Sequence, residues 1–126
     1  MAKKKLIWKT TSDAQDYVGA RNYLMLIYSE AKSNTLLAKI RNAKTITRAA
    51  KDLLRASGLP LLRPDDPHVG ADLKRIEKAK PLSPVLLIRG NILRGVPLIV
   101  ADGYHRICAI CHYDESAAIS CRLIST

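Results

Sequence analysis

The sequence of 126 residues lacks most features that would place it outside the ordinary globular class. Its six glycines and six prolines are too few for a low-complexity or disordered chain. Its longest apolar runs, Pro84 to Ile88 and Pro97 to Ala101, fall far short of the roughly 20 residues that cross a bilayer. The lysine-rich start leads into only three apolar residues, which is too few for a secretory signal. We therefore expect a cytoplasmic protein.

Cysteine is also scarce. Cys108, Cys111 and Cys121 are an odd number near one end, which is not the spacing of a disulfide framework. His105 and His112 flank the first two and suggest zinc. However, at 100° per residue both cysteines fall on the apolar side of a helix, while the histidines lie further round. We expect reduced, buried thiols at Cys108 and Cys111, and no metal site.

Acidic residues are few as well. The chain has 21 Lys or Arg against 11 Asp or Glu. Residues 1–58 hold 12 of these cations and only 4 acids, whereas residues 59–126 hold 9 and 7. This asymmetry is typical of a half that contacts a polyanion such as nucleic acid, although it also serves solubility.

The patterning of the first 58 residues predicts helices. Ser12-Asp13-Ala14-Gln15 has the form of a capping box, and apolar residues then recur three and four apart to near Ala31. Asn34 and Thr47 are suitable caps for two further short helices, the last ending at Gly58. Residues 1–58 are therefore predicted to be a basic helical segment.

The pattern changes after Pro60, where short helices alternate with short strands. These elements predict an α+β subdomain over residues 59–126, which packs with the first segment into one domain. The expected elements are a helix at about Val69 to Ala79, strands at Val85 to Arg89 and Leu98 to Ala101, a helix from Asp102 to Tyr113 and a strand around Ile119 to Leu123.

A buried strand that passes through Gly103 directly into a helix is the most informative feature. The start of a helix exposes unpaired amides and a partial positive charge, which together attract phosphate or carboxylate. His105 and Arg106 in the first turn could add charge-assisted hydrogen bonds. In the alternative interpretation, Gly103 only makes a tight turn, Asp102 caps the helix and Arg106 is solvated.

The stretch from about Leu59 to Ile124 resembles the N-terminal domain shared by ParB partition proteins and sulfiredoxin. The order in that domain is a strand, a helix, a proline-led strand, a second strand, a glycine-led helix and a last strand. At the turn its members carry Gly-Glu-Arg-Arg or Gly-Cys-His-Arg, where this chain has Gly103-Tyr104-His105-Arg106. The resemblance implies a small mixed sheet with helices, and nucleotide phosphates bound by these four residues. The protein is not expected to require a cofactor, and a nucleotide with Mg²⁺ is a possible ligand.

Two departures narrow this expectation. Sulfiredoxin chemistry needs the cysteine that Tyr104 replaces, and a phenol cannot take its place, so that activity is not expected. The chain also stops at Thr126, before the regions that complete a partition clamp. We expect a ParB-like domain that binds a nucleotide or another phosphorylated small molecule in a DNA-linked or regulatory role.

One alternative is an enzyme of the same fold, either a nucleotide-dependent kinase or a nuclease. Asp66, His68, Asp102 and His105 are its candidate catalytic residues, as metal-positioning groups or as the base. Asp66 follows Pro64 and precedes Pro67, so turn chemistry also explains it.

A second alternative is nucleic-acid binding through residues 34–58. Arg48, Lys51 and Arg55 recur at helical spacing, and Lys44 lies just before them. Two short helices joined around Ala43 to Ile46 would form a helix-turn-helix, with these cations near the DNA. A solvated helix face is the competing interpretation.

Overall fold

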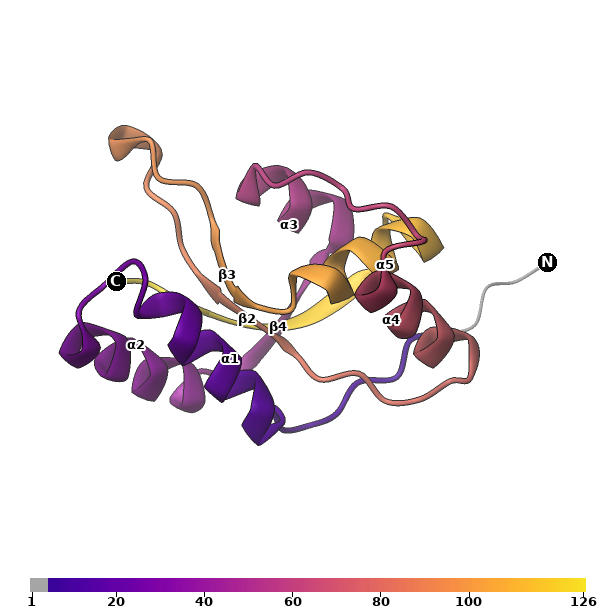
Figure 1. Cartoon of the computed structure of the whole chain (residues 1–126), viewed down its shortest axis with the longest axis horizontal. Helices are drawn as coiled ribbons and strands as arrows, with labels where there is room; N and C mark the ends of the chain where they lie inside the picture. The colour runs from indigo at the N-terminus through magenta and orange to yellow at the C-terminus, as the bar shows by residue number, and fades with distance from the viewer. Residues whose placement is uncertain (1–4) are drawn as a thin grey trace.

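A four-stranded mixed sheet lies between two groups of helices in the computed structural model, which describes residues 5–126 (Figure 1). The expectation of no secretory signal is based on the lysine-rich start, and part of that start lies outside these residues. The α+β class expected from the sequence is confirmed. The strand order is β1 (Thr45–Ala49), β4 (Ala118–Ile124), β2 (Val85–Ile88) and β3 (Ile99–Asp102). β4 is antiparallel to β1 and parallel to β2, and β2 is antiparallel to β3.

The helices cover both faces of this sheet (Figure 1). α1 (Ala14–Leu24) and α2 (Glu30–Asn42) pack on one face. α3 (Ala50–Ser57), α4 (Pro67–Glu77) and α5 (Tyr104–Asp114) pack on the other. None of the helices within residues 5–126 is long and apolar enough to cross a membrane.

β2 is buried on both faces, which explains its uninterrupted apolar sequence. Val85 and Leu87 point into the core beneath α3, α4 and α5. Leu86 and Ile88 point into the core beneath α1 and α2. The strand thus joins two hydrophobic cores.

The elements predicted after Pro60 are all present, with boundaries within a few residues of those expected. β2 and β3 form an antiparallel hairpin, with a short 3₁₀ turn, η1 (Ile92–Arg94), at its tip. The resemblance implies a strand before α4, but residues 59–66 contain no strand.

The single helix predicted from Ser12 to near Ala31 is wrong in its extent. The Ser12 hydroxyl accepts a hydrogen bond from Arg122 Nε at 3.1 Å, so it does not cap a helix. α1 begins at Ala14 without a side-chain cap and ends at Leu24. A new helix starts after Ser29, whose hydroxyl accepts the backbone amide of Lys32 at 3.1 Å.

Two further helix caps were also wrongly predicted. Asn34 lies within α2, where its side chain accepts a hydrogen bond from Arg21 Nε at 3.1 Å. Thr47 lies in β1, which pairs with β4 over five residues. β-Branched residues favour this strand once β4 offers an edge for pairing. The predicted helix-turn-helix is therefore wrong, because a strand separates α2 from α3.

Candidate functional site

The α5 turn, Gly103 to Arg106, lies where β3 passes into α5. Gly103 has φ 107°, a left-handed conformation that L side chains rarely adopt. A Cβ at this position would lie 2.5 Å from Val85 Cγ1, so the turn also needs glycine to pack on β2. No side chain caps the start of α5, and Asp102 does not take the capping role considered from the sequence. The first amides of α5 therefore lack the partner that a capping side chain provides.

The guanidinium of Arg106 points into the protein. Its side chain is 14% exposed, and its Nη1 donates to the Ser83 carbonyl oxygen at 2.8 Å. Its Nη2 lies 3.5 Å from Asp16 Oδ1 and 3.7 Å from Asp102 Oδ2. These contacts fasten α5 to α1 and to the segment before β2, so Arg106 is a positioning residue for the turn.

Asp16 and Asp102 form a close pair of carboxyl groups behind the turn. Burial, and then repulsion by Asp16, raise the pKa of Asp102 to about 7, against the lowering effect of Arg106. The Ser83 hydroxyl donates a short hydrogen bond to Asp16 Oδ2 and accepts the Asp13 amide at 3.1 Å. A carboxyl group with a pKa near neutrality can both accept and release a proton under ordinary conditions.

A third carboxylate, Asp72, reaches the same region from α4. It interacts with the charges of Arg106, His105 and His68, and burial raises its pKa. Sequence reasoning missed both Asp16 and Asp72. The sequence does contain a signal for them, which is an acidic residue on the apolar face of a helix. Asp16 is four residues before the buried Ala20, and Asp72 is four residues before the buried Ile76.

Two of the predicted catalytic candidates are brought together at the turn. The ring centroids of His68 and His105 lie 4.8 Å apart, on the first turns of α4 and α5. Asp66 caps α4 by accepting the amides of His68 and Val69, each at 3.0 Å. The hydrogen bond from the Val69 amide lowers the pKa of Asp66 most, and the hydrogen bond from the His68 amide lowers it further. Asp66 thus has a structural role that accounts for its position.

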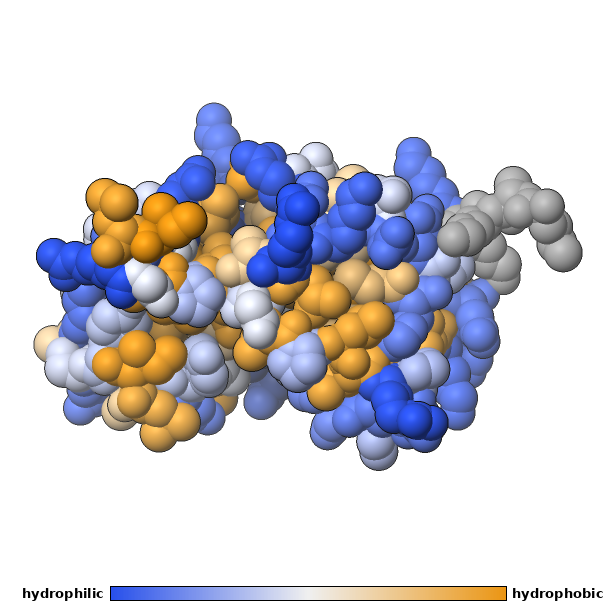
Figure 2. Space-filling view, turned by 90° about the horizontal axis from the view of Figure 1, so that it is seen from above, coloured by the Kyte–Doolittle hydropathy of each residue, from blue (hydrophilic) through white to orange (hydrophobic). Residues whose placement is uncertain are grey.

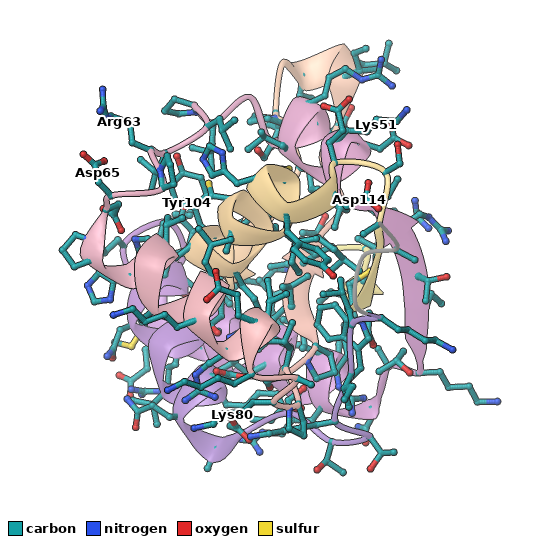
Figure 3. The ribbon with its side chains drawn as sticks, turned by 90° about the vertical axis from the view of Figure 1, so that its right-hand side faces the viewer. Lys51, Arg63, Asp65, Lys80, Tyr104 and Asp114 are labelled. Atoms are coloured by element: carbon teal, nitrogen blue, oxygen red, sulfur yellow. The ribbon has the colours of Figure 1, made fainter. Side chains whose placement is uncertain are left out.

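The loop before α4 is fastened over α5. The Tyr104 hydroxyl donates a short hydrogen bond to the Pro60 carbonyl oxygen, and His112 Nε2 lies 2.6 Å from the Leu62 carbonyl oxygen. Figure 3 shows Arg63 and Asp65 at the periphery, while Tyr104 lies further in at the start of α5. Tyr104 therefore contributes to the framework of the site.

The three cysteines are free thiols. Cys108 and Cys121 are buried, whereas Cys111 is only partly buried, which corrects the expectation for Cys111. Burial raises the pKa of all three, that of Cys111 to about 11, so their reactive thiolate forms are disfavoured. Within residues 5–126, no group of three or more His, Cys, Asp or Glu side chains is placed to hold a metal ion.

The four cations predicted to contact nucleic acid do not share one helix. Lys44 precedes β1 and Arg48 lies in β1, while Lys51 and Arg55 lie on α3. All four are exposed, and Arg55 pairs with Asp52 at 3.2 Å. Their placement offers phosphate contacts but no helix that enters a groove as a helix-turn-helix does.

No protein-family model matches the chain, and searches of curated proteins and of solved structures likewise found no match.

The α5 turn fits a phosphate group in two respects: an uncapped helix start and two neighbouring imidazoles. The guanidinium of Arg106 contacts Asp16, Asp102 and the Ser83 carbonyl in this arrangement. The side chains nearest to a bound anion would therefore be those of His68 and His105.

Proposed function

We propose that the α5 turn binds the phosphate groups of a nucleotide. The observation that carries this proposal is the uncapped start of α5 after Gly103, with the His68 and His105 rings 4.8 Å apart beside it. Amides at a helix start point their hydrogens at an anion, and the helix dipole favours negative charge there. Imidazoles add donors that strengthen when they are protonated.

The acids behind the turn limit which ligand fits. Arg106 offsets the charge of Asp16 and Asp102, and the high pKa of Asp102 leaves that carboxyl partly protonated near pH 7. Asp72 adds a further carboxyl on the α4 side. A nucleotide that carries Mg²⁺ suits such a site, because Mg²⁺ binds phosphate oxygens together with one or two carboxylates. We therefore propose the magnesium complex of a nucleoside di- or triphosphate as the ligand.

Isothermal titration of the chain with MgATP, MgCTP and MgGTP tests this proposal. We expect one of them to bind at one site per chain. His105→Ala should weaken that binding by roughly 10- to 100-fold, because a charge-assisted hydrogen bond is worth roughly 1.5–3 kcal/mol. His68→Ala should weaken it as well.

His112→Ala is the matched control, since His112 is on the same helix but faces the Leu62 carbonyl near the other end. Its binding should equal that of the unmodified chain. The proposal is wrong if no nucleotide binds, or if all three histidine variants bind equally well.

A second candidate function, phosphoryl transfer from the bound nucleotide to an acceptor hydroxyl, is favoured by the pKa of Asp102 near 7. Asp102 directly precedes the turn and would accept the hydroxyl proton. A hydroxyl acceptor would be added to the complex with the magnesium nucleoside triphosphate. Release of nucleoside diphosphate together with the phosphorylated acceptor, lost in Asp102→Asn while nucleotide binding persists, would establish it. Binding without turnover on any hydroxyl acceptor tested would leave a binding domain.

A further inference from the structure

A groove of about 720 Å³ lies on the α3 side of the sheet, away from the α5 turn. Its floor includes the partly exposed side chains of Leu98 and Leu123, with the buried Leu87 beneath them. Leu53 and Ala56 of α3 form one wall, and the β2–β3 hairpin forms the other. Figure 1 shows the hairpin rising beside α3. In Figure 2, which looks onto this side, hydrophobic atoms lie between long hydrophilic side chains.

The hairpin wall is held in shape by its own hydrogen bonds. Asn91 and Val96 exchange backbone bonds of 2.8 and 2.9 Å, and the Asn91 side chain accepts the Leu93 amide at 3.1 Å. The two arms come so close at Gly90 that a Cβ there would lie 2.4 Å from the Val96 carbonyl oxygen. The Leu98 amide donates to the Ala56 carbonyl at 3.0 Å and ties the hairpin to α3. The groove is therefore formed before any ligand binds.

The charges along the groove have one dominant sign. Arg48 and Arg89 line it and are exposed. Within residues 5–126, no carboxylate lies within ion-pair distance of either guanidinium. Asp52 also lines the groove, but it pairs with Arg55 at 3.2 Å. Arg48 Nη1 donates to the Thr47 carbonyl oxygen at 2.7 Å, so Arg89 is the cation left for a ligand. An occupant that matches both the apolar floor and Arg89 needs an apolar body and an anionic group.

We propose that this groove binds a small amphipathic anion, in which a medium-length hydrocarbon chain carries one carboxylate. The chain would lie on Leu98 and Leu123 between α3 and the hairpin, and the carboxylate would meet Arg89. The volume is within the range of roughly 300–1,000 Å³ of small-molecule sites, which are mostly apolar with a few placed polar groups. This site is separate from the α5 turn, so it does not depend on the proposed nucleotide.

Titration calorimetry with decanoate, 1-decanol and acetate separates the two parts of this ligand. We expect decanoate to bind at one site, 1-decanol to bind roughly tenfold more weakly, and acetate not to bind measurably. Arg89→Gln should weaken decanoate binding and leave 1-decanol binding unchanged. Arg48→Gln is the matched control and should change neither, because Arg48 is opposite Ile119 on β4 whereas the Arg89 amide bonds to Ile124 at the other end of that strand.

A groove-filling variant provides the steric test. Ala56→Trp places a large ring over the floor from an exposed position of α3 and should abolish decanoate binding. Ala38→Trp is the matched control, because Ala38 is an exposed alanine of α2 on the opposite face of the sheet, and it should bind decanoate normally. Should Ala56→Trp fail to fold, the two arginine variants decide the question.

Four results would overturn the proposal. Decanoate and 1-decanol could bind equally, or decanoate could bind Ala56→Trp as it binds the unmodified chain. Binding of phosphatidylglycerol vesicles without any binding of free decanoate would assign the exposed hairpin tip to a membrane surface. A dimer in sedimentation equilibrium that Ala56→Trp dissociates would assign the groove to a second copy of the chain.

Discussion

At the scale of single residues, a buried pair of carboxyl groups and one arginine determine the chemistry behind the α5 turn. Arg106 was expected from the sequence to face a ligand, and its place in the structure is between Asp16 and Asp102. That sequence-based role as a phosphate ligand stays a prediction. The observed contacts mean that substitution of Arg106 would leave two buried acids without their cation, which makes it a poor probe of binding.

Asp102→Asn should make the protein more stable at neutral and mildly alkaline pH. Because the pKa of Asp102 is raised from 3.8 to about 7, the folded chain holds a proton between those pH values that the unfolded chain has lost. The free energy of unfolding therefore falls as the pH rises through this range. Asparagine removes this contribution and can still donate a hydrogen bond to Asp16. Urea unfolding at several pH values between about 5 and 8 measures the change.

The slope should become shallower in Asp102→Asn but should not vanish, because burial also raises the pKa of Asp72. Asp65→Asn is the control, since Asp65 is exposed and paired with Arg63 at the surface. An Asp102→Asn variant with the same pH dependence as the unmodified chain would contradict the assignment of the raised pKa.

At the scale of elements, the junction of β3 and α5 depends on Gly103. Gly103→Ala should destabilise the protein for two reasons. Alanine in a left-handed backbone conformation costs about 1–2 kcal/mol, and the clash of the new Cβ with Val85 costs about 1–3 kcal/mol. Gly58→Ala is the matched control, because Gly58 has φ 67° and a Cβ added there would meet nothing within 4 Å. Thermal and urea unfolding of both variants would measure the difference.

The contact with Val85 can be isolated by a double-mutant cycle. Val85→Ala should recover part of the stability lost in Gly103→Ala, since it removes the methyl group 2.5 Å from the new Cβ. Equal losses for Gly103→Ala and Gly58→Ala, with no coupling to Val85, would show that only the backbone conformation requires glycine.

Elements whose signals are local could be predicted from the sequence, and those that depend on distant partners could not. The β3–Gly103–α5 junction follows from an apolar β-branched run, a glycine and a helical period that are adjacent in the chain. β1 depends on pairing with β4, which lies about 70 residues further along. Thr47 fits a helix cap equally well on local evidence, and only the tertiary partner decides between the two.

At the scale of the whole molecule, the candidate site is assembled from parts far apart in the sequence. α1 supplies Asp16, α4 supplies His68 and Asp72, and the α5 turn supplies His105. The sequence singled out both histidines and the glycine, because they stand beside recognisable turns. It could not pair Asp16 with Asp102, because the contact between α1 and β3 is a product of packing on the sheet.

The two proposed sites lie at opposite ends of β3. The α5 turn lies at the start of α5, while the apolar groove lies between α3 and the hairpin. Ligands at the two sites would therefore contact different residues of the same framework, and each site can be tested by variants that leave the other unchanged.

The most direct test of the central claim is an NMR titration of ¹⁵N-labelled protein with the magnesium nucleotide that binds in calorimetry. The account predicts that the amide resonances of Gly103, Tyr104 and His105 shift together and saturate at the calorimetric Kd, while that of Gly58 does not move. Shifts confined to other segments, or no shift at the α5 turn up to millimolar nucleotide, would contradict it.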